Sequence, residues 1–220
     1  MPTFACVLRS GGRYTPAWTA ALHDAVRRHA PEFDRFVAVT DMETDIAGVE
    51  RIALRHGWPG WWSKFEAFRS DVAQGDVAVL CDLDTIVAGP LADLATGGLA
   101  AMEDWLLPGR CSTALVRWHG AELADLYAAF AADPDGWMEP GSCGDVPNAV
   151  HGDQVVVDHL LRRSGRRPAS LQAAHPGLID AYDAARGIEA PLTIFIGDTK
   201  PMLGTDGQLR PPVRELSEAA

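Results

Sequence analysis

Short apolar runs alternate with amphipathic stretches through the first half of the chain. Apolar runs predict buried strands at residues 4–8, 35–40 and 76–87, and an alternating pattern predicts a further strand at 49–54. Apolar residues recur at helical spacing from Thr15 to His29, and a hydroxyl residue followed by proline is typical of a helix start. Strands that alternate with helices predict a three-layer α/β domain with a mainly parallel central sheet.

The second half of the chain has shorter apolar runs and longer polar segments. Its expected elements are strands at 99–103, 112–118 and 192–196 and helices at 121–132 and 152–165. A polar loop is expected at 133–148, and loops of that length often carry functional residues. We expect a single domain over residues 1–210, followed by a loose C-terminal tail at 211–220.

Composition and charge restrict the functions to be considered. The chain has 220 residues, of which 47% are hydrophobic, and its 19 basic and 30 acidic residues give a formal net charge of −11. An acidic chain repels polyphosphate backbones, which argues against nucleic-acid binding through overall charge. No stretch approaches the ~18 consecutive apolar residues of a membrane span. The N-terminus shows no secretory signal pattern, and the four cysteines are far apart, so we expect reduced thiols and a cytoplasmic protein.

The first candidate for chemistry is the acidic pair Asp82 and Asp84, which follows the apolar run 77–81. Residues two apart in a strand share one face, so the two carboxylates are expected side by side. Like charges this close repel unless a cation or a proton lies between them, and Mg²⁺ or Mn²⁺ prefers such oxygen ligands. Open α/β sheets bind ligands at the carboxyl ends of their strands. The alternative is two solvated acids at a strand end.

Several motifs follow one another in the order of a known enzyme family. After a first strand with a tyrosine-bearing loop come W-P-G-W-W-S-K-F-E, V-L-C-D-L-D-T, C-S-T-A-L-V-R-W, G-D-Q and I-G-D-T-K-P. Over residues 4–202 this order resembles the GT-A glycosyltransferases, particularly the branch related to bacterial galactosyltransferases and glycogenin. The resemblance implies a GT-A fold and transfer of a sugar from a nucleotide-sugar donor, usually a UDP-sugar. The acceptor is unknown, as is the oligomeric state.

The resemblance also implies how the donor is held. Asp82 and Asp84 would bind a Mn²⁺ or Mg²⁺ ion that bridges the two phosphates, and this cation would stabilise the negative charge on the departing diphosphate. Tyr14 would stack on the base, and Lys200 would contact the diphosphate. The full set of expected donor-binding residues is Arg9, Tyr14, Lys64, Asp82, Ser112 and Lys200.

Two further residues, Asp153 and Gln154, match an acid–amide pair beside the transferred sugar and are the expected catalytic residues. The relatives retain the anomeric configuration, so Asp153 would stabilise an oxocarbenium-like sugar. An inverting reaction would instead need a carboxylate base, either Asp104 or Asp153.

The chain departs from the family pattern in two places. The stretch 193–197 lacks the histidine that usually acts as third metal ligand, and Asp198 or water would take its place. Ser112 stands where the family usually has asparagine.

Two other functions remain as alternatives. Asp82-Leu-Asp-Thr85 also resembles the nucleophile motif of haloacid-dehalogenase-type phosphatases, and Gly197-Asp198 resembles their late acidic motif. In that mechanism Asp82 would attack phosphate and Asp84 would act as acid and base. The glycine before Thr85 is missing, however, and the motif normally follows the first strand. The second alternative is a non-catalytic module that binds a nucleotide sugar.

A further helix is expected directly after the aromatic segment 56–62. Ser63 and Glu66 have the spacing of a capping box, which predicts a helix that begins at Ser63 and ends at Gly75. The three tryptophans Trp58, Trp61 and Trp62 fit either core packing or a wall on which a sugar stacks. The sequence leaves that choice open.

Overall fold

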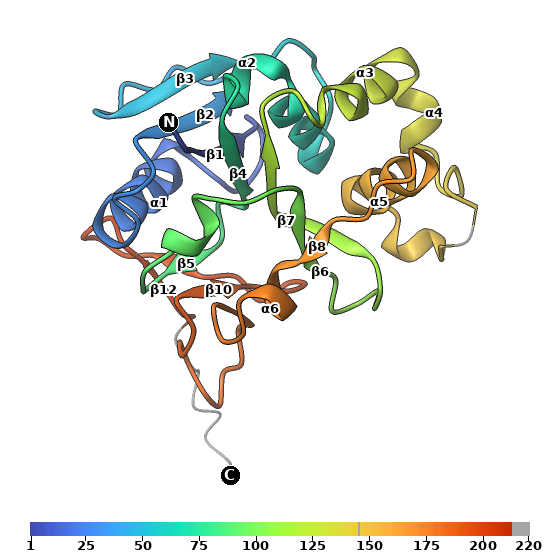
Figure 1. The fold of residues 1–220 in the computed structure, drawn as a ribbon. Helices are drawn as coiled ribbons and strands as arrows, with labels where there is room; N and C mark the ends of the chain where they lie inside the picture. The colour runs from blue at the N-terminus through green and yellow to red at the C-terminus, as the bar shows by residue number, and fades with distance from the viewer. Residues whose placement is uncertain (145, 213–220) are drawn as a thin grey trace.

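A seven-stranded mixed sheet forms the centre of the computed structural model, which describes residues 1–144 and 146–212 (Figure 1). The strands, in spatial order, are β3 (Val49–Ala53), β2 (Arg35–Thr40), β1 (Thr3–Leu8), β4 (Val77–Cys81), β7 (Cys111–His119), β6 (Ala100–Glu103) and β8 (Ala169–Ser170). Strands β3, β2, β1 and β4 run parallel, and β7 is antiparallel to both of its neighbours. The predicted three-layer α/β fold with a mainly parallel sheet is confirmed.

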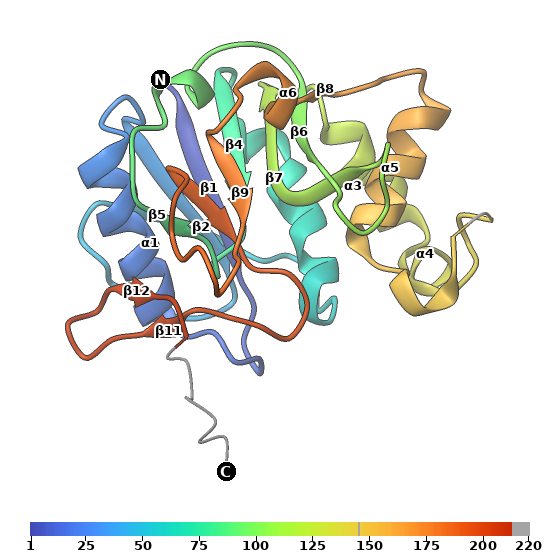
Figure 2. The same cartoon turned by 90° about the horizontal axis from the view of Figure 1, so that it is seen from below.

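Helices and a small second sheet cover the two faces of the central sheet (Figures 1 and 2). The helical segments are α1 (Pro16–His29), η1 (Gly60–Phe68), α2 (Ser70–Ala73), η2 (Ala92–Leu94), α3 (Ala124–Ala132), α4 (Pro134–Met138), η3 (Asn148–Val150), α5 (Asp153–Arg163) and α6 (Leu171–Ala174). Side chains alternate along β4: Val79 and Cys81 join the core on the α1 side, whereas Ala78 and Leu80 join the core under η1, α3 and α5. The strand is therefore buried on both faces.

The second sheet comes from distant parts of the chain. It contains β5 (Ile86–Val87), β10 (Leu192–Ile194) and β9 (Ile179–Ala181), in that order, and a hairpin of β11 (Met202–Leu203) and β12 (Leu209–Arg210) follows. Because β5 pairs with β10, the segment 195–201 that follows β10 is brought close to residues 82–85. The predicted strand at 192–196 thus exists, although it ends at Ile194 and belongs to this smaller sheet.

The predicted strand at 76–87 is wrong in its middle. Strand β4 ends at Cys81, β5 begins at Ile86, and residues 82–85 form a turn between them. The two acids therefore lie in a turn that joins the two sheets, and the two-residue repeat of a strand does not set their orientation. The apolar pattern continued through Leu83 because that residue is buried too.

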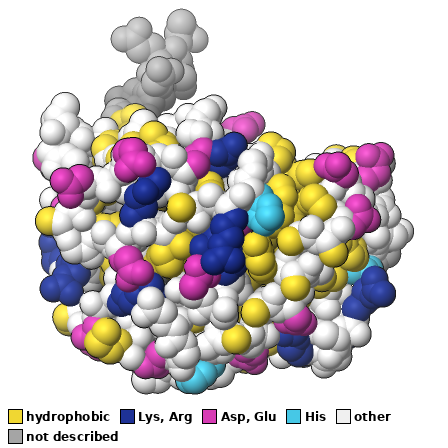
Figure 3. Space-filling view, turned by 90° about the horizontal axis from the view of Figure 1, so that it is seen from above, with side chains coloured by type: hydrophobic (Ala, Val, Ile, Leu, Met, Phe, Trp, Pro, Cys, Tyr) yellow, Lys and Arg dark blue, Asp and Glu magenta, His cyan; other side chains and the backbone are white. Residues whose placement is uncertain are grey.

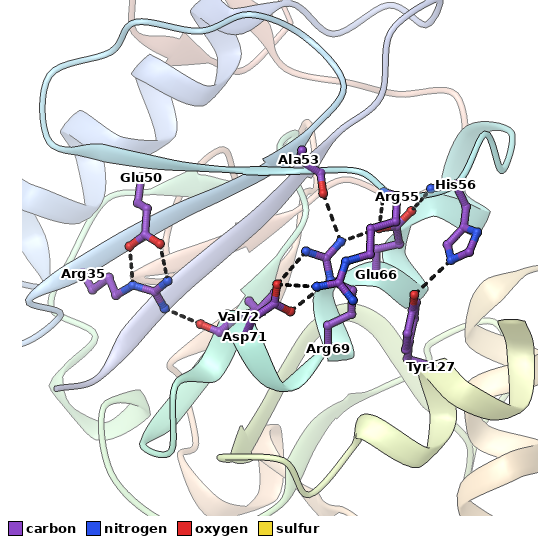
Figure 4. A network of polar contacts seen from close by, with 10 residues as sticks. All are labelled: Arg35, Glu50, Ala53, Arg55, His56, Glu66, Arg69, Asp71, Val72 and Tyr127. Atoms are coloured by element: carbon purple, nitrogen blue, oxygen red, sulfur yellow. Dashed lines mark hydrogen bonds and ion pairs between the residues drawn. The ribbon is translucent and has the colours of Figure 1, made fainter.

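The predicted helix from Ser63 to Gly75 and its capping box are also wrong, and Figure 4 shows the contacts that Glu66 makes instead. Residues 60–68 form the 3₁₀ segment η1, and only the short α2 follows. Ser63 Oγ donates to the carbonyl of Gly60, 2.7 Å away. Glu66 is fully buried, accepts the backbone N–H groups of Arg55 and His56 at 2.7 and 2.8 Å, and pairs with Arg69. Its carboxylate thus fastens η1 to the chain that leaves β3 instead of capping a helix.

Smaller differences concern helix ends and loops. Helix α1 spans the predicted residues, but the Thr15 side chain makes no capping hydrogen bond. The expected loop at 133–148 contains the short helix α4, for which Asp133 acts as N-cap. All four cysteines, Cys6, Cys81, Cys111 and Cys143, are buried. Most of the expected tail, residues 213–220, lies outside the described residues.

The surface over β3 and α3 shows how charge is distributed on one face (Figure 3). Basic groups lie beside acidic ones, and apolar side chains gather over the part that carries α3. This face carries no continuous basic surface. No helix within residues 1–144 and 146–212 has the length and hydropathy required to span a bilayer.

Candidate active site

The candidate site lies where the turn 82–85 meets the segment 195–201, the loop after β1 and the N-terminus of α5. Strands β1 and β4 are parallel, so their carboxyl ends meet at one edge of the sheet. The backbone N–H of Asp82 donates to the carbonyl of Ala114 on β7, 3.0 Å away, which fixes the start of the turn. Most of the residues named from the sequence motifs lie around this edge.

Lys64 joins two of the predicted acids. Its Nζ lies 2.6 Å from Asp82 Oδ1 and 3.6 Å from Asp153 Oδ2. Burial alone would lower the pKa of Lys64, but the nearby carboxylates of Asp153 and Asp82 outweigh it and raise that pKa. The ammonium therefore stays charged. Asp153 is buried at the first position of α5, and Thr113 Oγ1 donates to its Oδ2.

Lys200 and Tyr14 both bind the second acid of the turn. Lys200 Nζ lies 2.7 Å from Asp84 Oδ2, and Tyr14 donates its hydroxyl to the same oxygen at 2.7 Å. Burial, followed by the charge of Asp84, raises the pKa of Tyr14, so the phenol stays protonated as a donor. The Tyr14 ring also packs edge-on against Trp18, with centroids 5.0 Å apart.

Gln154 connects the start of α5 to the β6–β7 hairpin. Its Nε2 donates to Asp104 Oδ2 at 2.7 Å, and Ser112 Oγ donates to its Oε1 at 3.3 Å. Asp104 is buried, and its Oδ1 accepts the backbone N–H of Leu106 at 2.8 Å. The structure thus brings together Gln154, Asp104 and Ser112 beside Asp153.

Two predicted residues are not grouped with the acidic pair. Arg9 forms an ion pair with Asp41, which directly follows β2. Asp198 is exposed, and the described residues contain no group of three histidine, cysteine, aspartate or glutamate side chains placed to hold a metal ion. Asp198 is therefore not placed as a third ligand beside Asp82 and Asp84.

The charge of the turn is compatible with a divalent cation. Burial raises the pKa of Asp82 to about 6; Lys64 opposes this shift, and the neighbouring charge of Asp84 adds to it. A cation between the two carboxylates would relieve that repulsion. Mg²⁺ commonly uses one or two protein carboxylates and completes its shell with water and substrate phosphates. Asp82 and Asp84 fit such an ion without a third side chain.

Some residues of the site were missed by sequence reasoning, although signals for them existed. Asp41 follows β2 just as Asp82 follows β4, so the rule for strand ends applied to it as well. Thr113 was hidden within the motif C-S-T, and only the fold shows that it reaches Asp153.

The three tryptophans of segment 56–62 separate into two kinds. Trp58 and Trp62 are buried, the former stacked on His56 with centroids 4.2 Å apart and the latter on Phe130 at 5.6 Å. Trp61 is 56% exposed. Core packing therefore accounts for two of the three.

Comparisons with known proteins identify the fold. No family model and no curated protein matches the sequence. Among solved structures, galactosyltransferase LgtC in complex with donor and acceptor sugar analogues has a TM-score of 0.61 at 10% identity, over 90% of this chain and 88% of that one. The active-site mutant Q189E of LgtC gives the same values. Glycosyltransferase GlyE from Streptococcus pneumoniae TIGR4, in its apo form, has a TM-score of 0.59 at 14% identity, over 90% of this chain and 55% of that one.

These neighbours share one architecture with this chain at low sequence identity. The resemblance inferred from the motif order is therefore confirmed at the level of the fold. This chain has the GT-A fold of the glycosyltransferases.

Proposed function

We propose that the protein transfers a sugar from a nucleoside-diphosphate sugar, a UDP-sugar, to an acceptor hydroxyl. The observation that carries this proposal is the double pairing at one turn. Lys64 binds Asp82 and Lys200 binds Asp84, and Asp153 lies 3.6 Å from the Lys64 ammonium. Lysine ammonium groups that can bind a diphosphate thus lie beside the pair Asp153 and Gln154, whose carboxylate and amide can bind a sugar.

The mechanism follows from where the charges lie. Asp82 and Asp84 would hold Mn²⁺ or Mg²⁺, which when bound supplies positive charge to the leaving diphosphate. Lys200 is the cation of the chain best placed to contact that diphosphate, because it is 25% exposed and lies on the segment 195–201. Lys64 is more enclosed, and it orients Asp82 and Asp153 toward the site.

We propose that the reaction retains the anomeric configuration. The Asp153 carboxylate is held by Thr113 and Lys64 and would stabilise positive charge on the sugar. Asp104 is a poor candidate for the base of an inverting reaction, because both of its oxygens already accept hydrogen bonds from Gln154 and from backbone. The cytoplasmic location expected from the sequence stays a prediction, which the burial of the four cysteines supports.

No observation favours the phosphatase alternative, in which Asp198 would join Asp82 and Asp84. Asp198 is exposed, and the part of the chain that the structure describes does not group it with those acids. The binding-module alternative differs from the proposal only in turnover, so measurement of turnover separates the two.

The test combines binding with turnover. Thermal unfolding is measured with UDP and Mn²⁺, and UDP release is measured from a panel of UDP-sugars. We expect UDP to stabilise the wild type in a metal-dependent way and Asp84→Asn to lose both signals. Asp206→Asn, an exposed acid on the β11–β12 turn, is the matched control and should keep them. Binding without turnover would support the module, and hydrolysis of a generic phosphoester without any effect of UDP would support the phosphatase.

A further inference from the structure

Exposed apolar side chains gather around one part of the candidate site. Within residues 1–144 and 146–212, the large hydrophobic residues that are exposed are Met1, Trp61, Trp105, Leu106 and Met202. Three of them, Trp61, Trp105 and Leu106, lie on the segments that flank the Asp153–Gln154 pair. Exposed apolar groups rimmed by polar residues are typical of binding surfaces.

Trp61 is placed beside the start of α5. It lies three residues before Lys64 in η1, and residues three apart in a 3₁₀ helix lie on the same side. Its indole Nε1 is 3.5 Å from the position that a Cβ on Gly152 would occupy, and Gly152 directly precedes Asp153. The indole therefore lies against the residue at which α5 begins, next to the acid expected to face the sugar.

Trp105 and Leu106 lie on a loop that is hydrogen-bonded to the same pair. They begin the loop 104–110 between β6 and β7, and Asp104 is held by Gln154 Nε2 at 2.7 Å. The Asp104 carboxylate also accepts the backbone N–H of Leu106, which turns the chain at this point. Gln154 thus fixes the position of a second exposed apolar segment.

Two neighbouring tryptophans serve as a comparison for the exposed Trp61. Trp58 and Trp62 lie within four residues of it and are only 7% and 8% exposed. The local sequence therefore has access to the aromatic core around Phe130, yet the Trp61 indole lies outside it. Core packing does not explain the third tryptophan.

We propose that Trp61 is the platform on which the acceptor binds, and that the acceptor is a carbohydrate with a pyranose at its reacting end. A pyranose has one face of C–H groups, which packs on an indole, and a rim of hydroxyls. The Gln154 amide has one N–H and one lone pair beyond its bonds to Asp104 and Ser112, and these supply hydrogen-bonding partners for such a rim. A lipid chain would need continuous apolar surface, and these polar groups interrupt it. This inference rests on the proposed function and adds the class of its acceptor.

The test uses fluorine NMR of protein labelled with 5-fluorotryptophan. The chain has seven tryptophans, and Trp61→Phe assigns the resonance of Trp61. Methyl glycosides of galactose, glucose, mannose and N-acetylglucosamine are titrated with and without UDP and Mn²⁺, alongside a serine-containing peptide and a short-chain fatty acid. We expect a glycoside to shift the Trp61 resonance, and Trp61→Ala to weaken glycoside binding about tenfold when that binding is measured by calorimetry, as for the loss of a central aromatic contact. Trp61→Phe should restore most of it.

A matched control and a donor-side readout keep the outcomes distinct. Trp137→Phe changes a half-buried indole that bonds to the Ala129 carbonyl outside the site, and it should bind glycoside like the wild type. UDP binding measured by calorimetry reports the donor side separately. If UDP binds but no glycoside moves the Trp61 resonance, or if the peptide or fatty acid moves it instead, the inference is overturned and the proposed function stands. If UDP fails to bind, the proposed function fails, and the titration without UDP still decides the role of Trp61.

Discussion

The two lysine–aspartate pairs of the site have the same chemistry, but their lysines are held by different kinds of structure. Lys64 lies 2.6 Å from Asp82, and Lys200 lies 2.7 Å from Asp84. Lys64 belongs to η1, whose Phe65 stacks on Phe130 of α3 with centroids 3.9 Å apart. Lys200 follows β10 on the segment 195–201, which has no regular secondary structure. One pair is therefore built into the core, and the other is carried by a loop.

The segment 195–201, which carries Lys200, has few contacts that fix its conformation. Residues 197–199 are exposed, and Gly197 has φ +64°, a left-handed conformation that favours glycine. Besides Asp84, Lys200 Nζ donates to the carbonyl of Phe195 at 3.4 Å, which lies on the same segment. This difference teaches that Lys64, held by η1, can orient Asp82 before a ligand arrives, whereas Lys200, held by the segment 195–201, can adjust its position around a diphosphate.

The largest expected effect comes from Lys64→Met. Loss of the ammonium would leave the buried carboxylate of Asp153 and the partly exposed carboxylate of Asp82 without their shared cation. We expect UDP release to fall on the order of 10²–10³-fold. The free energy of unfolding should fall by about 3 kcal/mol, as when one partner of a buried ion pair is removed. Urea unfolding and initial rates measure the two effects, and unchanged stability would contradict the idea that this side is built into the core.

Lys200→Met should reduce activity with a smaller loss of stability than Lys64→Met. The Lys200 side chain is 25% exposed and lies on a loop, but Asp84 is only 9% exposed and would keep only the Tyr14 hydroxyl as a donor to its Oδ2, so we expect the free energy of unfolding to fall by about 1 kcal/mol. Loss of the cation should raise the donor KM and lower UDP release about 10²-fold. Arg210→Met, an exposed basic residue paired with Asp206, is the matched control. A loss of stability equal to that of Lys64→Met would remove the distinction between the two sides.

The pH response tests the coupling between the two acids. The pKa of Asp82 is raised from 3.8 to about 6, so the folded protein binds more protons than the unfolded chain between these values. This site therefore lowers stability as pH rises from about 4 to 6, and the penalty is complete above that range. Asp84→Asn removes a neighbouring negative charge and should lower the Asp82 pKa in the ligand-free protein. Carbon NMR of the carboxyl groups measures the shift, and an unchanged or higher midpoint would contradict it.

Ser112→Ala is expected to have the smallest effect. Its Oγ donates to Gln154 Oε1 at 3.3 Å, while Gln154 keeps its shorter bond to Asp104 at 2.7 Å. We expect UDP release to fall by a factor of about three, the cost of one ordinary hydrogen bond. Steady-state kinetics measure it. A loss as large as that of Lys200→Met would show that Ser112 contacts the donor directly, as the family resemblance implies.

The sequence predicted the parts of the molecule that depend on local pattern. Runs such as 35–40 and 77–81 are apolar because both faces of the central strands are covered, and such runs can be recognised without the fold. The motif order also placed Lys64, Asp82 and Asp153 in one site. The strand predictions succeeded because each depends on neighbours along the chain. The three site residues lie within ion-pair distance, and their roles stay predictions.

The parts that failed depend on partners far apart in sequence. Glu66 has the spacing of a capping acid, but it is buried against the N–H groups of Arg55 and His56, which no local pattern shows. Arg9 pairs with Asp41, thirty-two residues later, which no local pattern shows, and its contact with the donor stays a prediction. The turn at 82–85 required β10, from the end of the chain, to pair with β5. Tertiary contacts decided each of these cases.

The central claim is tested most directly by proton NMR of the sugar during reaction. The wild type is incubated with a UDP-sugar, Mn²⁺ and methyl glycosides, and the anomeric protons of donor and product are followed in time. The proposal predicts that the donor signal is lost, that UDP appears, and that the first product keeps the donor's anomeric configuration; Asp84→Asn should leave the donor intact. Unchanged donor with the wild type, or equal consumption by Asp84→Asn, would contradict it.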